Sequence, residues 1–277
     1  MSVRILATGL TGTIGRHFGP SVGDLGVRLE DPTTNFGSSL DNCVVIHSAA
    51  AVGEALVRRD LRRSYSVNVT GAVELARAVF RSSAERFIYV STSHVYERQP
   101  EVMFLSESDS VLPQGQYALQ KLVAEELITE VFRGEPSRLT IARVFSVVHQ
   151  TQPPGTLGST IMSLLRDPKL KLNFADDERD ILSPKVIAGI LVSLAQSATA
   201  PRTVNICSGT ATTVRETARL LLGNETFSQI EERVIRGQSQ SPRIVGNSDV
   251  LTSTIRKAGS ELFAASVVDW ELSRQNS

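Results

Sequence analysis

The feature that most constrains this chain is a glycine-spaced loop that follows its first strand-like segment. Residues 3–7 (VRILA) form a short apolar run, and Thr8-Gly9-Leu10-Thr11-Gly12-Thr13-Ile14-Gly15 follows at once. A glycine at each third position allows a tight turn, brings backbone N–H groups close to a pyrophosphate, and lets the next element pack on the strand. The place of these glycines directly after a strand predicts a dinucleotide-binding site.

Further apolar runs alternate with helical patterns through the first two-thirds of the chain. Residues 43–49, 87–92 and 139–145 are almost continuously apolar, as is typical of parallel strands buried on both faces. Between them, residues 68–80 and 117–132 repeat apolar side chains at helical spacing. This alternation predicts an α/β fold with a Rossmann-type, doubly wound parallel sheet.

After about residue 150 the pattern loosens, which predicts a small C-terminal substrate-binding lobe. We expect a loop around 151–159, a strand at 169–174 and a helix at 183–197, whereas 237–277 is polar and without a clear pattern. RTVNICSG and TVRETARLLL add a strand and a helix. We therefore assign 1–150 to a dinucleotide-binding domain, to which 183–207 returns, and 151–182 and 208–277 to the lobe.

Composition excludes several classes of partner. The 29 basic and 29 acidic residues balance, so nothing predicts an electrostatic hold on nucleic acid or membrane, and a small molecule is the expected partner. Cys43 and Cys207 lie inside apolar runs as buried strand residues, which suits the cytoplasm. No leader or membrane-spanning run is expected. The four histidines lack ligand spacing, so no metal site is predicted.

Tyr117 and Lys121 are the first candidate catalytic pair. Four positions apart on a predicted helix, they share one face, so the ammonium can lie near the phenol. A nearby positive charge lowers the tyrosine pKa from about 10 toward working pH and makes the phenol a usable acid or base. The alternative is an ordinary surface pair.

A hydroxyl cluster, Ser91-Thr92-Ser93, ends the predicted strand at 87–92. In an open α/β sheet the site lies beyond the carboxyl ends of the strands, where a hydroxyl can bind a substrate oxygen. A strand-end turn, which Ser and Thr also favour, is the alternative.

The helix at 117–132 carries a second apolar stripe, formed by Ala124, Leu127, Ile128 and Val131. One stripe packs on the sheet, and the other needs a different cover. Either the intramolecular core is wider, or this helix and the 68–80 helix form the four-helix interface of a homodimer.

These motifs together resemble the extended short-chain dehydrogenases/reductases, in particular the nucleotide-sugar epimerases, dehydratases and reductases. TGLTGTIG resembles the TGxxGxxG loop of the family, and VVIHSAA, NVTGAVELARA, STSHVY, YALQK and ARVFSVV resemble its later motifs. The resemblance covers most of the chain. It implies NAD or NADP as cofactor, bound by Gly9, Thr11, Gly12, Thr13, Ile14, Gly15, Ala49, Ala50, Asn68, Tyr117, Lys121 and Phe145.

The resemblance also implies a catalytic set and a substrate site. Aligned on Tyr96, the catalytic hydroxyl of the family falls on Thr92, which would hold the substrate oxygen with Tyr117 while Lys121 contacts the nicotinamide ribose. ERDILSPKVIAG resembles RDFVHVDDVA, whose arginine holds the nucleotide diphosphate, here Arg179. A guanidinium suits this role, although a solvated charge run is the alternative. Ser146, expected to contact substrate, stands where the family usually has asparagine.

Two departures from the family bear on function. Thr92 is followed by Ser93-His94 and not by the Asp-Glu pair of the dehydratases, so dehydration is the least expected reaction; the alternative is that His94 replaces that acid. Only about 27 residues separate Gly15 from Cys43, too few for the usual two strands and two helices. GVRLEDP (26–32) is expected to supply one short strand that resembles the family's third. Glu30 or Asp31 could bind the adenosine end, and Arg16 and His17 a 2′-phosphate, so the choice between NAD and NADP stays open.

The sequence thus predicts an NAD(P)-dependent oxidoreductase or epimerase acting on a nucleotide-diphosphate sugar by hydride transfer, with Tyr117 as acid or base. One alternative is an NADPH-dependent 4-ketoreductase of deoxysugar synthesis. Another is a catalytically idle NAD(P)-binding regulatory protein.

Overall fold

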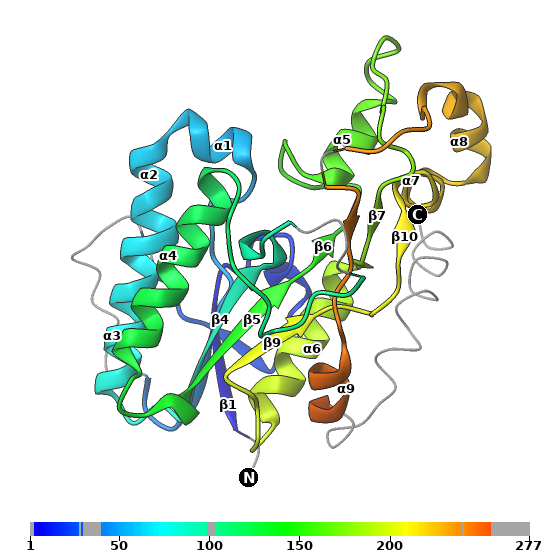
Figure 1. The fold of residues 1–277 in the computed structure, drawn as a ribbon. Coiled ribbons are helices and arrows are strands. Elements are labelled where there is room, and N and C mark those ends of the chain that lie inside the picture. The colour runs from blue at the N-terminus through cyan, green and yellow to red at the C-terminus, as the bar shows by residue number, and fades with distance from the viewer. Residues whose placement is uncertain (1–2, 28, 30–39, 99–102, 240, 256–277) are drawn as a thin grey trace.

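The computed structural model describes residues 3–27, 29, 40–98, 103–239 and 241–255. A central parallel sheet lies between two layers of helices, with a smaller lobe above one end of the sheet (Figure 1). Within the described residues this sheet contains six strands in the order β2-β1-β3-β4-β5-β9. The α/β doubly wound architecture expected from the sequence is confirmed. Its strands are β1 (Arg4–Thr8), β2 (Val22–Asp24), β3 (Cys43–His47), β4 (Arg86–Thr92), β5 (Leu139–Val144) and β9 (Thr203–Ile206).

One face of the sheet is covered by helices that come early in the chain. The helix expected at 68–80 begins as a π-helical turn, η3 (Ser66–Gly71), and continues as α3 (Ala72–Arg81). Beside it lies α4 (Gln116–Val131). Ala124 and Ile128 of α4 are fully buried with Phe87 and Tyr89 of the sheet. Two shorter helices, α1 (Glu54–Arg59) and α2 (Leu61–Tyr65), precede η3.

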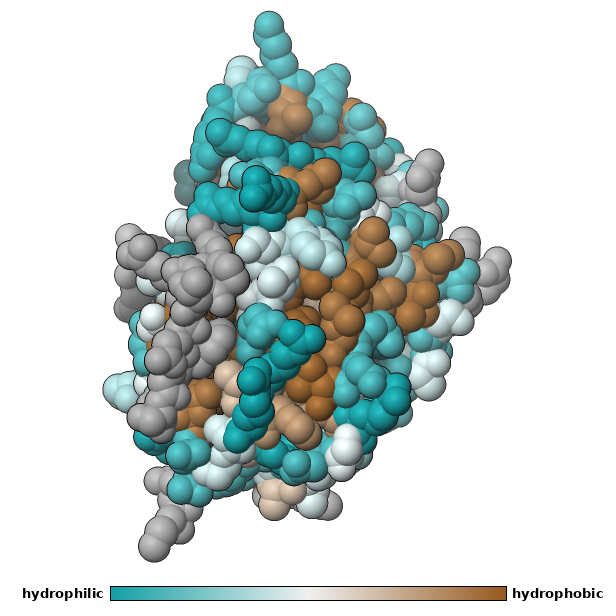
Figure 2. Space-filling model, turned by 90° about the vertical axis from the view of Figure 1, so that its left-hand side faces the viewer, coloured by the Kyte–Doolittle hydropathy of each residue, from teal (hydrophilic) through white to brown (hydrophobic). Residues whose placement is uncertain are grey.

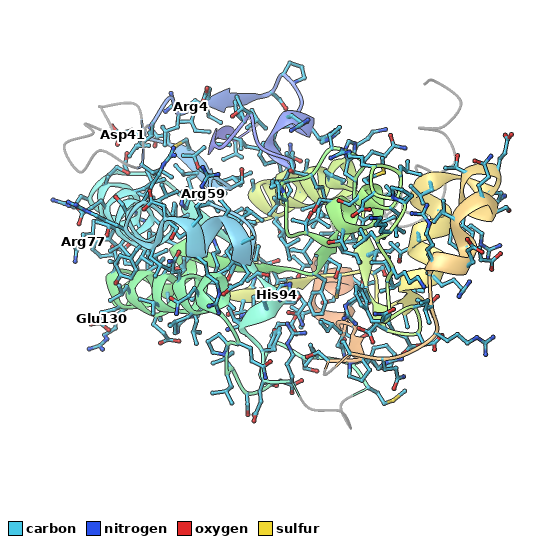
Figure 3. All side chains as sticks on the ribbon, turned by 90° about the horizontal axis from the view of Figure 1, so that it is seen from above. Arg4, Asp41, Arg59, Arg77, His94 and Glu130 are labelled. Carbon is cyan, nitrogen blue, oxygen red and sulfur yellow. The ribbon has the colours of Figure 1, made fainter. Side chains whose placement is uncertain are left out.

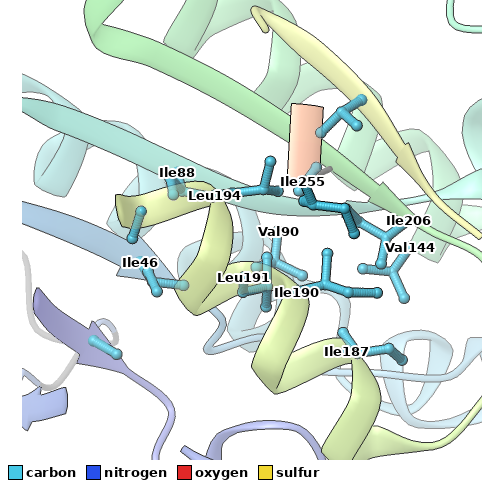
Figure 4. Packing of buried hydrophobic residues seen from close by; sticks show 14 of the residues in the cluster. Ile46, Ile88, Val90, Val144, Ile187, Ile190, Leu191, Leu194, Ile206 and Ile255 are labelled. Atoms are coloured by element: carbon cyan, nitrogen blue, oxygen red, sulfur yellow. The ribbon is translucent and has the colours of Figure 1, made fainter. Parts of the chain in front are cut away.

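The opposite face is covered by α6 (Pro184–Gln196) and α9 (Asp249–Ile255). The α6 helix starts where the sequence signals it, because Ser183 caps the N–H of Val186 and Pro184 occupies the first turn. Its apolar side chains pack on the strands (Figure 4). Residues 249–255, assigned above to the lobe, pack on the sheet through Leu251 and Ile255.

The lobe has its own core and its own short strands. The core is formed by Val148, Ile161, Leu164, Leu172, Ala175, Val214, Ala218, Leu221, Phe227, Ile230 and Val234. Residues 151–159, expected to be a loop, lead into α5 (Leu157–Ser163). The remaining lobe helices are α7 (Val214–Leu222) and α8 (Asn224–Ile230), and the 3-10 turn η6 (Glu231–Arg233) follows α8. Further 3-10 turns lie in the sheet domain: η1 (Gly15–His17), η4 (Ser93–Val95) and η5 (Pro136–Arg138). The short strands are β6 (Ser146–Val147), β7 (Glu178–Arg179), β8 (Ile181–Leu182), β10 (Thr212–Thr213) and β11 (Arg243–Ile244).

The strand expected at 169–174 is wrong. Only Leu172 makes a β-bridge there, to Val234. The alternation of Leu170, Leu172 and Phe174 reflects burial in the lobe core and not a strand of a sheet.

The shortened segment behind the glycine loop also differs from expectation. The 3-10 turn Gly15–His17 takes the place of the helix, and the next strand, β2, lies at Val22–Asp24. Of the strand expected at 26–32, Gly26, Val27 and Leu29 are not in a strand, and the other residues lie outside the described ranges. The β2 strand pairs with β1 in parallel, so it occupies the position of the second strand of a doubly wound sheet and not the third. Gly19 and Pro20 end the 3-10 turn and return the chain to the sheet after a few residues. Glu30 and Asp31 lie outside the described residues.

None of the helices in the described ranges combines the length and apolar character needed to cross a membrane.

Candidate active site

A single large cavity of about 1500 Å³ runs along the carboxyl ends of the central strands. Its wall includes the glycine loop and Arg179 of the lobe. Parallel strands place their carboxyl ends at one edge of the sheet, which is where open α/β sheets bind ligands. Of the predicted site residues, its wall contains Gly9, Thr11, Gly12, Thr13, Ile14, Gly15, Ala49, Ala50, Thr92, Tyr117, Lys121, Phe145, Ser146 and Arg179.

The glycine loop closes tightly against its own backbone and against the neighbouring strand. Gly9 has φ +77°, and a Cβ there would lie 2.7 Å from the backbone N of Ala49. A Cβ on Gly15 would lie 2.0 Å from the carbonyl oxygen of Gly9. The N–H of Gly12 donates to Gly9 O at 2.9 Å, whereas those of Thr13 and Ile14 donate to no other residue in the described ranges. The loop therefore offers backbone donors on the cavity wall and fits the pyrophosphate of a dinucleotide.

Asp24 is a residue of the cofactor end that the sequence analysis missed. It is the last residue of β2, is exposed, and lies on the cavity wall beyond the glycine loop. Its Oδ1 accepts the N–H of Gly26 at 2.9 Å, which holds the carboxylate at the strand end. An acid at the end of the second strand is where a doubly wound fold binds the adenosine ribose. The sequence analysis did not expect a strand at Val22–Asp24 and therefore did not single out Asp24.

Asn68 lies behind the cavity wall and not on it. Its side chain is 1% exposed and binds both backbone groups of Ala51, accepting from N at 2.7 Å and donating to O at 3.0 Å. It also donates to Gln120 of α4 at 2.9 Å. The structure therefore gives Asn68 an indirect role, since it fastens the segment that carries Ala49 and Ala50 to α4.

Tyr117 and Lys121 both reach the cavity from the first turns of α4. The Lys121 Nζ donates to Val90 O at 2.6 Å and lies 4.0 Å from the centre of the Tyr89 ring. Burial lowers the pKa of Lys121 to about 7 and raises the pKa of Tyr117 to about 12. This direction is opposite to the one expected for Tyr117, because desolvation outweighs a lysine that is itself only partly charged near neutral pH.

Glu54, the first residue of α1, caps the N-terminus of α4. Its two carboxylate oxygens accept the backbone N–H groups of Gln116 and Tyr117, each at 3.0 Å. Gly115 (φ +97°) allows this approach, since a Cβ there would lie 2.8 Å from the Glu54 carboxylate. Helix N-termini leave such donors unpaired and favour a negative charge. No local sequence pattern signals this cap, because the two partners lie 62 and 63 residues apart.

The hydroxyl cluster at the end of β4 contributes two of its three members to the cavity wall, Ser91 and Thr92. Thr92 is 6% exposed, and its Oγ1 accepts the N–H of His94 at 3.3 Å. The Oγ of Ser91 is buried and has no hydrogen-bond partner among the residues that the structure describes. Ser93 lies outside the wall, whereas His94 is part of it.

The lobe brings Arg179 to the cavity wall. Its side chain is 14% exposed and pairs with the fully buried Asp177 at 2.8 Å, while Nη1 donates to the carbonyl oxygens of Glu178 and Pro242. This burial excludes the alternative of a solvated charge run. Three of the five N–H groups of the guanidinium are thereby used, which leaves others for a ligand.

Arg143, part of the same motif as Phe145, has a structural position. It is 8% exposed and pairs with Glu125 of α4 at 2.8 Å, away from the cavity wall.

Comparison with known proteins agrees with this geometry. The model of the "NAD dependent epimerase/dehydratase family" matches residues 24–207. The chain is 24% identical over 276 residues to GDP-6-deoxy-D-mannose reductase of Pseudomonas aeruginosa, covering 88% of this chain and 86% of that protein. It is 28% identical over 207 residues to GDP-6-deoxy-D-talose 4-dehydrogenase of Aggregatibacter actinomycetemcomitans, covering 68% and 69%.

Among solved structures, RMD from Pseudomonas aeruginosa complexed with NADPH superposes with a TM-score of 0.76 at 24% identity, covering 98% of this chain and 99% of that one. The fold that the sequence motifs imply is thus the one observed. It carries the glycine loop, the strand-end hydroxyls and the helix with Tyr117 and Lys121. The chain belongs to the NAD-dependent epimerase/dehydratase family, whose members are extended short-chain dehydrogenases/reductases.

Proposed function

We propose that this enzyme transfers a hydride between a nicotinamide cofactor and a sugar carbon of a nucleoside diphosphate sugar, with Tyr117 moving the proton. One observation carries the proposal: a single cavity joins the glycine loop, the Thr92–Tyr117–Lys121 set and Arg179. A dinucleotide on the loop would place its nicotinamide near Tyr117, and the remaining length of the cavity reaches the arginine that would hold the diphosphate.

The chemistry of the chain's own residues favours the reductive direction. With its pKa raised to about 12, Tyr117 keeps its proton at neutral pH. It can therefore donate that proton to the oxygen of a sugar ketone as the carbonyl carbon accepts hydride. Thr92 would hydrogen-bond the same oxygen. A reduced nicotinamide held by the glycine loop would supply the hydride, and ketone, hydride and proton together would give the alcohol.

The two relatives named above favour net oxidation or reduction of a sugar, because one is named as a reductase and the other as a dehydrogenase. A UDP-glucose 4-epimerase of Yersinia pestis matches over only 41% of this chain. We therefore favour a ketoreductase of nucleotide sugars, and an epimerase is the second candidate because it needs the same residues.

For the cofactor we propose a preference for NAD(H). The Asp24 carboxylate at the end of β2 would accept hydrogen bonds from the ribose hydroxyls and repel a 2′-phosphate. The structure of RMD holds NADPH, so this preference would distinguish the two proteins.

Binding and turnover separate the candidates. Calorimetric titration with NADH and NADPH comes first, followed by assays with nucleotide sugars and 4-keto nucleotide sugars. Net oxidation of the reduced cofactor supports a reductase, and interconversion of sugars without net oxidation supports an epimerase. Tyr117→Phe should abolish turnover and leave cofactor affinity nearly unchanged. An active Tyr117→Phe variant refutes the role of Tyr117, and cofactor binding without turnover of any sugar favours the idle regulatory protein.

We also propose a homodimer that forms through α2, η3, α3 and α4. The sequence allowed the second apolar stripe of α4 to pack either in the chain's own core or against a second copy. In the structure Ala124 and Ile128 are buried in the chain's own core, whereas Leu127 is 44% exposed. Leu61 (47%), Tyr65 (47%) and Leu119 (44%) are also exposed in these helices. Figure 2 shows apolar side chains gathered on this face. Burial of such a patch against a second copy is the usual way to cover it.

A further inference from the structure

His94 lies on the cavity wall with Arg179, and the Nε2 edge of its ring has no hydrogen-bond partner among the described residues. It belongs to η4, directly after the strand that carries Thr92, and it keeps an accessible surface. Seen from above, it lies between the helices of the sheet domain and the lobe (Figure 3). The other ring edge is occupied, because Nδ1 lies 2.9 Å from Nη2 of Arg98.

This contact determines the tautomer of His94. A guanidinium can only donate hydrogen bonds, so Nδ1 accepts and the ring proton of the neutral imidazole sits on Nε2. Burial of the ring among the surrounding groups, followed by the positive charges of Arg98 and Arg179, lowers the pKa of His94 to about 4. The ring is therefore a neutral N–H donor at working pH. That state does not suit the acid of an elimination, so His94 is no substitute for the dehydratase acid.

The charges around His94 leave a positive excess. Arg98 pairs with no carboxylate in the described ranges, and its Nη1 is buried without a hydrogen-bond partner. Burial and the neighbouring Arg179 lower the pKa of Arg98 to about 10. Arg179, which faces His94 from β7, is compensated by Asp177. Glu54 faces it from α1 and opposes the arginines, but its carboxylate is engaged by the N-terminus of α4 and by Arg58.

The Arg98 side chain is half-buried, and its buried Nη1 lacks a partner among the described residues, so a ligand anion placed nearby would offset the cost of that uncompensated charge. We propose that His94 and Arg98 form a subsite that binds an anionic oxygen of the substrate, with Nε2–H of His94 as the donor and Arg98 as the charge behind it. The inference rests on the proposed function, because a nucleoside diphosphate sugar offers such oxygens from two sources. One is its phosphate groups, and the other is a carboxylate carried by the sugar.

The test measures binding to the NADH-loaded enzyme by calorimetry. The probes are UDP, GDP, UDP-glucose, GDP-mannose and UDP-glucuronic acid. The variants are His94→Ala, Arg98→Gln and His94→Gln, which keeps an N–H donor. Arg133→Gln serves as the matched control, since Arg133 is 78% exposed and pairs only with Glu130 on the far turn of α4.

If the anion is a phosphate, His94→Ala and Arg98→Gln weaken binding of all probes by about tenfold or more, whereas Arg133→Gln does not. If the anion is a sugar carboxylate, only UDP-glucuronic acid loses affinity. In either case His94→Gln should recover part of the loss, which a merely structural role of His94 would not predict. Retained NADH affinity shows that the variants are folded.

If His94→Ala and Arg98→Gln bind every probe as tightly as the wild-type enzyme does, the proposed subsite is wrong. A wild-type enzyme that binds NADH, none of the five probes and no dTDP-sugar instead overturns the proposed nucleotide-sugar function.

Discussion

The carboxylate of Glu54 accepts the backbone N–H of Tyr117 at 3.0 Å, so the candidate catalytic tyrosine is held at its main chain by a residue of another helix. Burial alone would raise the pKa of Glu54, but the N–H groups of Tyr117 and Gln116, together with Arg58, lower it below its ordinary value. The cap therefore keeps its charge throughout the neutral pH range.

Glu54→Ala should lower kcat more than it changes KM. Loss of the cap frees two N–H groups and lets the first turn of α4 shift, and small displacements of a catalytic group cost roughly tenfold or more in rate. The free energy of unfolding should fall by about 1 kcal/mol, as for other lost helix caps. Steady-state kinetics and urea unfolding measure both effects. Glu54→Gln, which keeps one acceptor oxygen, should fall between wild type and Glu54→Ala, and an unchanged kcat in Glu54→Ala contradicts the positioning role.

Lys121 should make the free energy of unfolding rise with pH in the neutral to alkaline range. Its pKa falls from 10.5 to about 7 on folding, so the unfolded chain binds more protons between these values. Stability should therefore increase from about pH 7 upward, by at most about 1.4 kcal/mol per pH unit from this residue. Lys121→Met should lose this slope, as followed by urea unfolding at several pH values. If the free energies of unfolding of the wild type and of Lys121→Met change with pH in the same way, the pKa of Lys121 is not lowered on folding.

Asp24→Ser should change the choice of cofactor. Removal of the carboxylate at the end of β2 removes the repulsion of a 2′-phosphate, so the ratio of NADPH to NADH affinity should rise by about tenfold. Titration of both cofactors into both proteins measures the ratio. Asp41→Ser, which changes an exposed acid elsewhere, is the control. A wild-type preference for NADPH would refute the role given to Asp24.

Glu125→Ala should destabilise the chain by about 3–5 kcal/mol, because it leaves the guanidinium of Arg143 buried without its partner. Replacement of both residues by leucine should cost less than this single change. Thermal or urea unfolding compares the two variants. If the double variant is the less stable, simple desolvation of Arg143 does not explain the effect.

Leu127→Arg should convert the proposed dimer to a monomer, because it places a charge in the centre of the apolar face of α4. Leu165→Arg is matched in size and exposure (46% against 44%) but lies in the lobe and should leave the dimer intact. Sedimentation velocity separates the two states. A wild-type protein that sediments as a monomer refutes the interface.

Much of the fold could be predicted from the sequence because its signals are local. The apolar runs of β3, β4 and β5 and the helical spacing within α4 each lie within a short segment of chain. Ser183, directly before α6, caps that helix by accepting the N–H of Val186 three residues later. The glycine spacing and the Tyr117–Lys121 spacing are equally local. Where such a signal was weak, as at 169–174, the predicted strand was wrong.

The sequence predicted most of the candidate site residues, but not the contacts that hold them or the effect of burial on their pKa values. The sequence by itself determined which residues lie at the carboxyl ends of the strands. It also determined that Tyr117 and Lys121 share one face of a helix. Only the tertiary structure decided that Asp24 ends the second strand, that Glu54 caps α4, and that Asn68 binds the main chain behind the wall. Burial likewise reversed the expected pKa shift of Tyr117. The physical reason is the same for all four: each depends on contacts or desolvation contributed by distant segments, which spacing along one strand or helix does not encode.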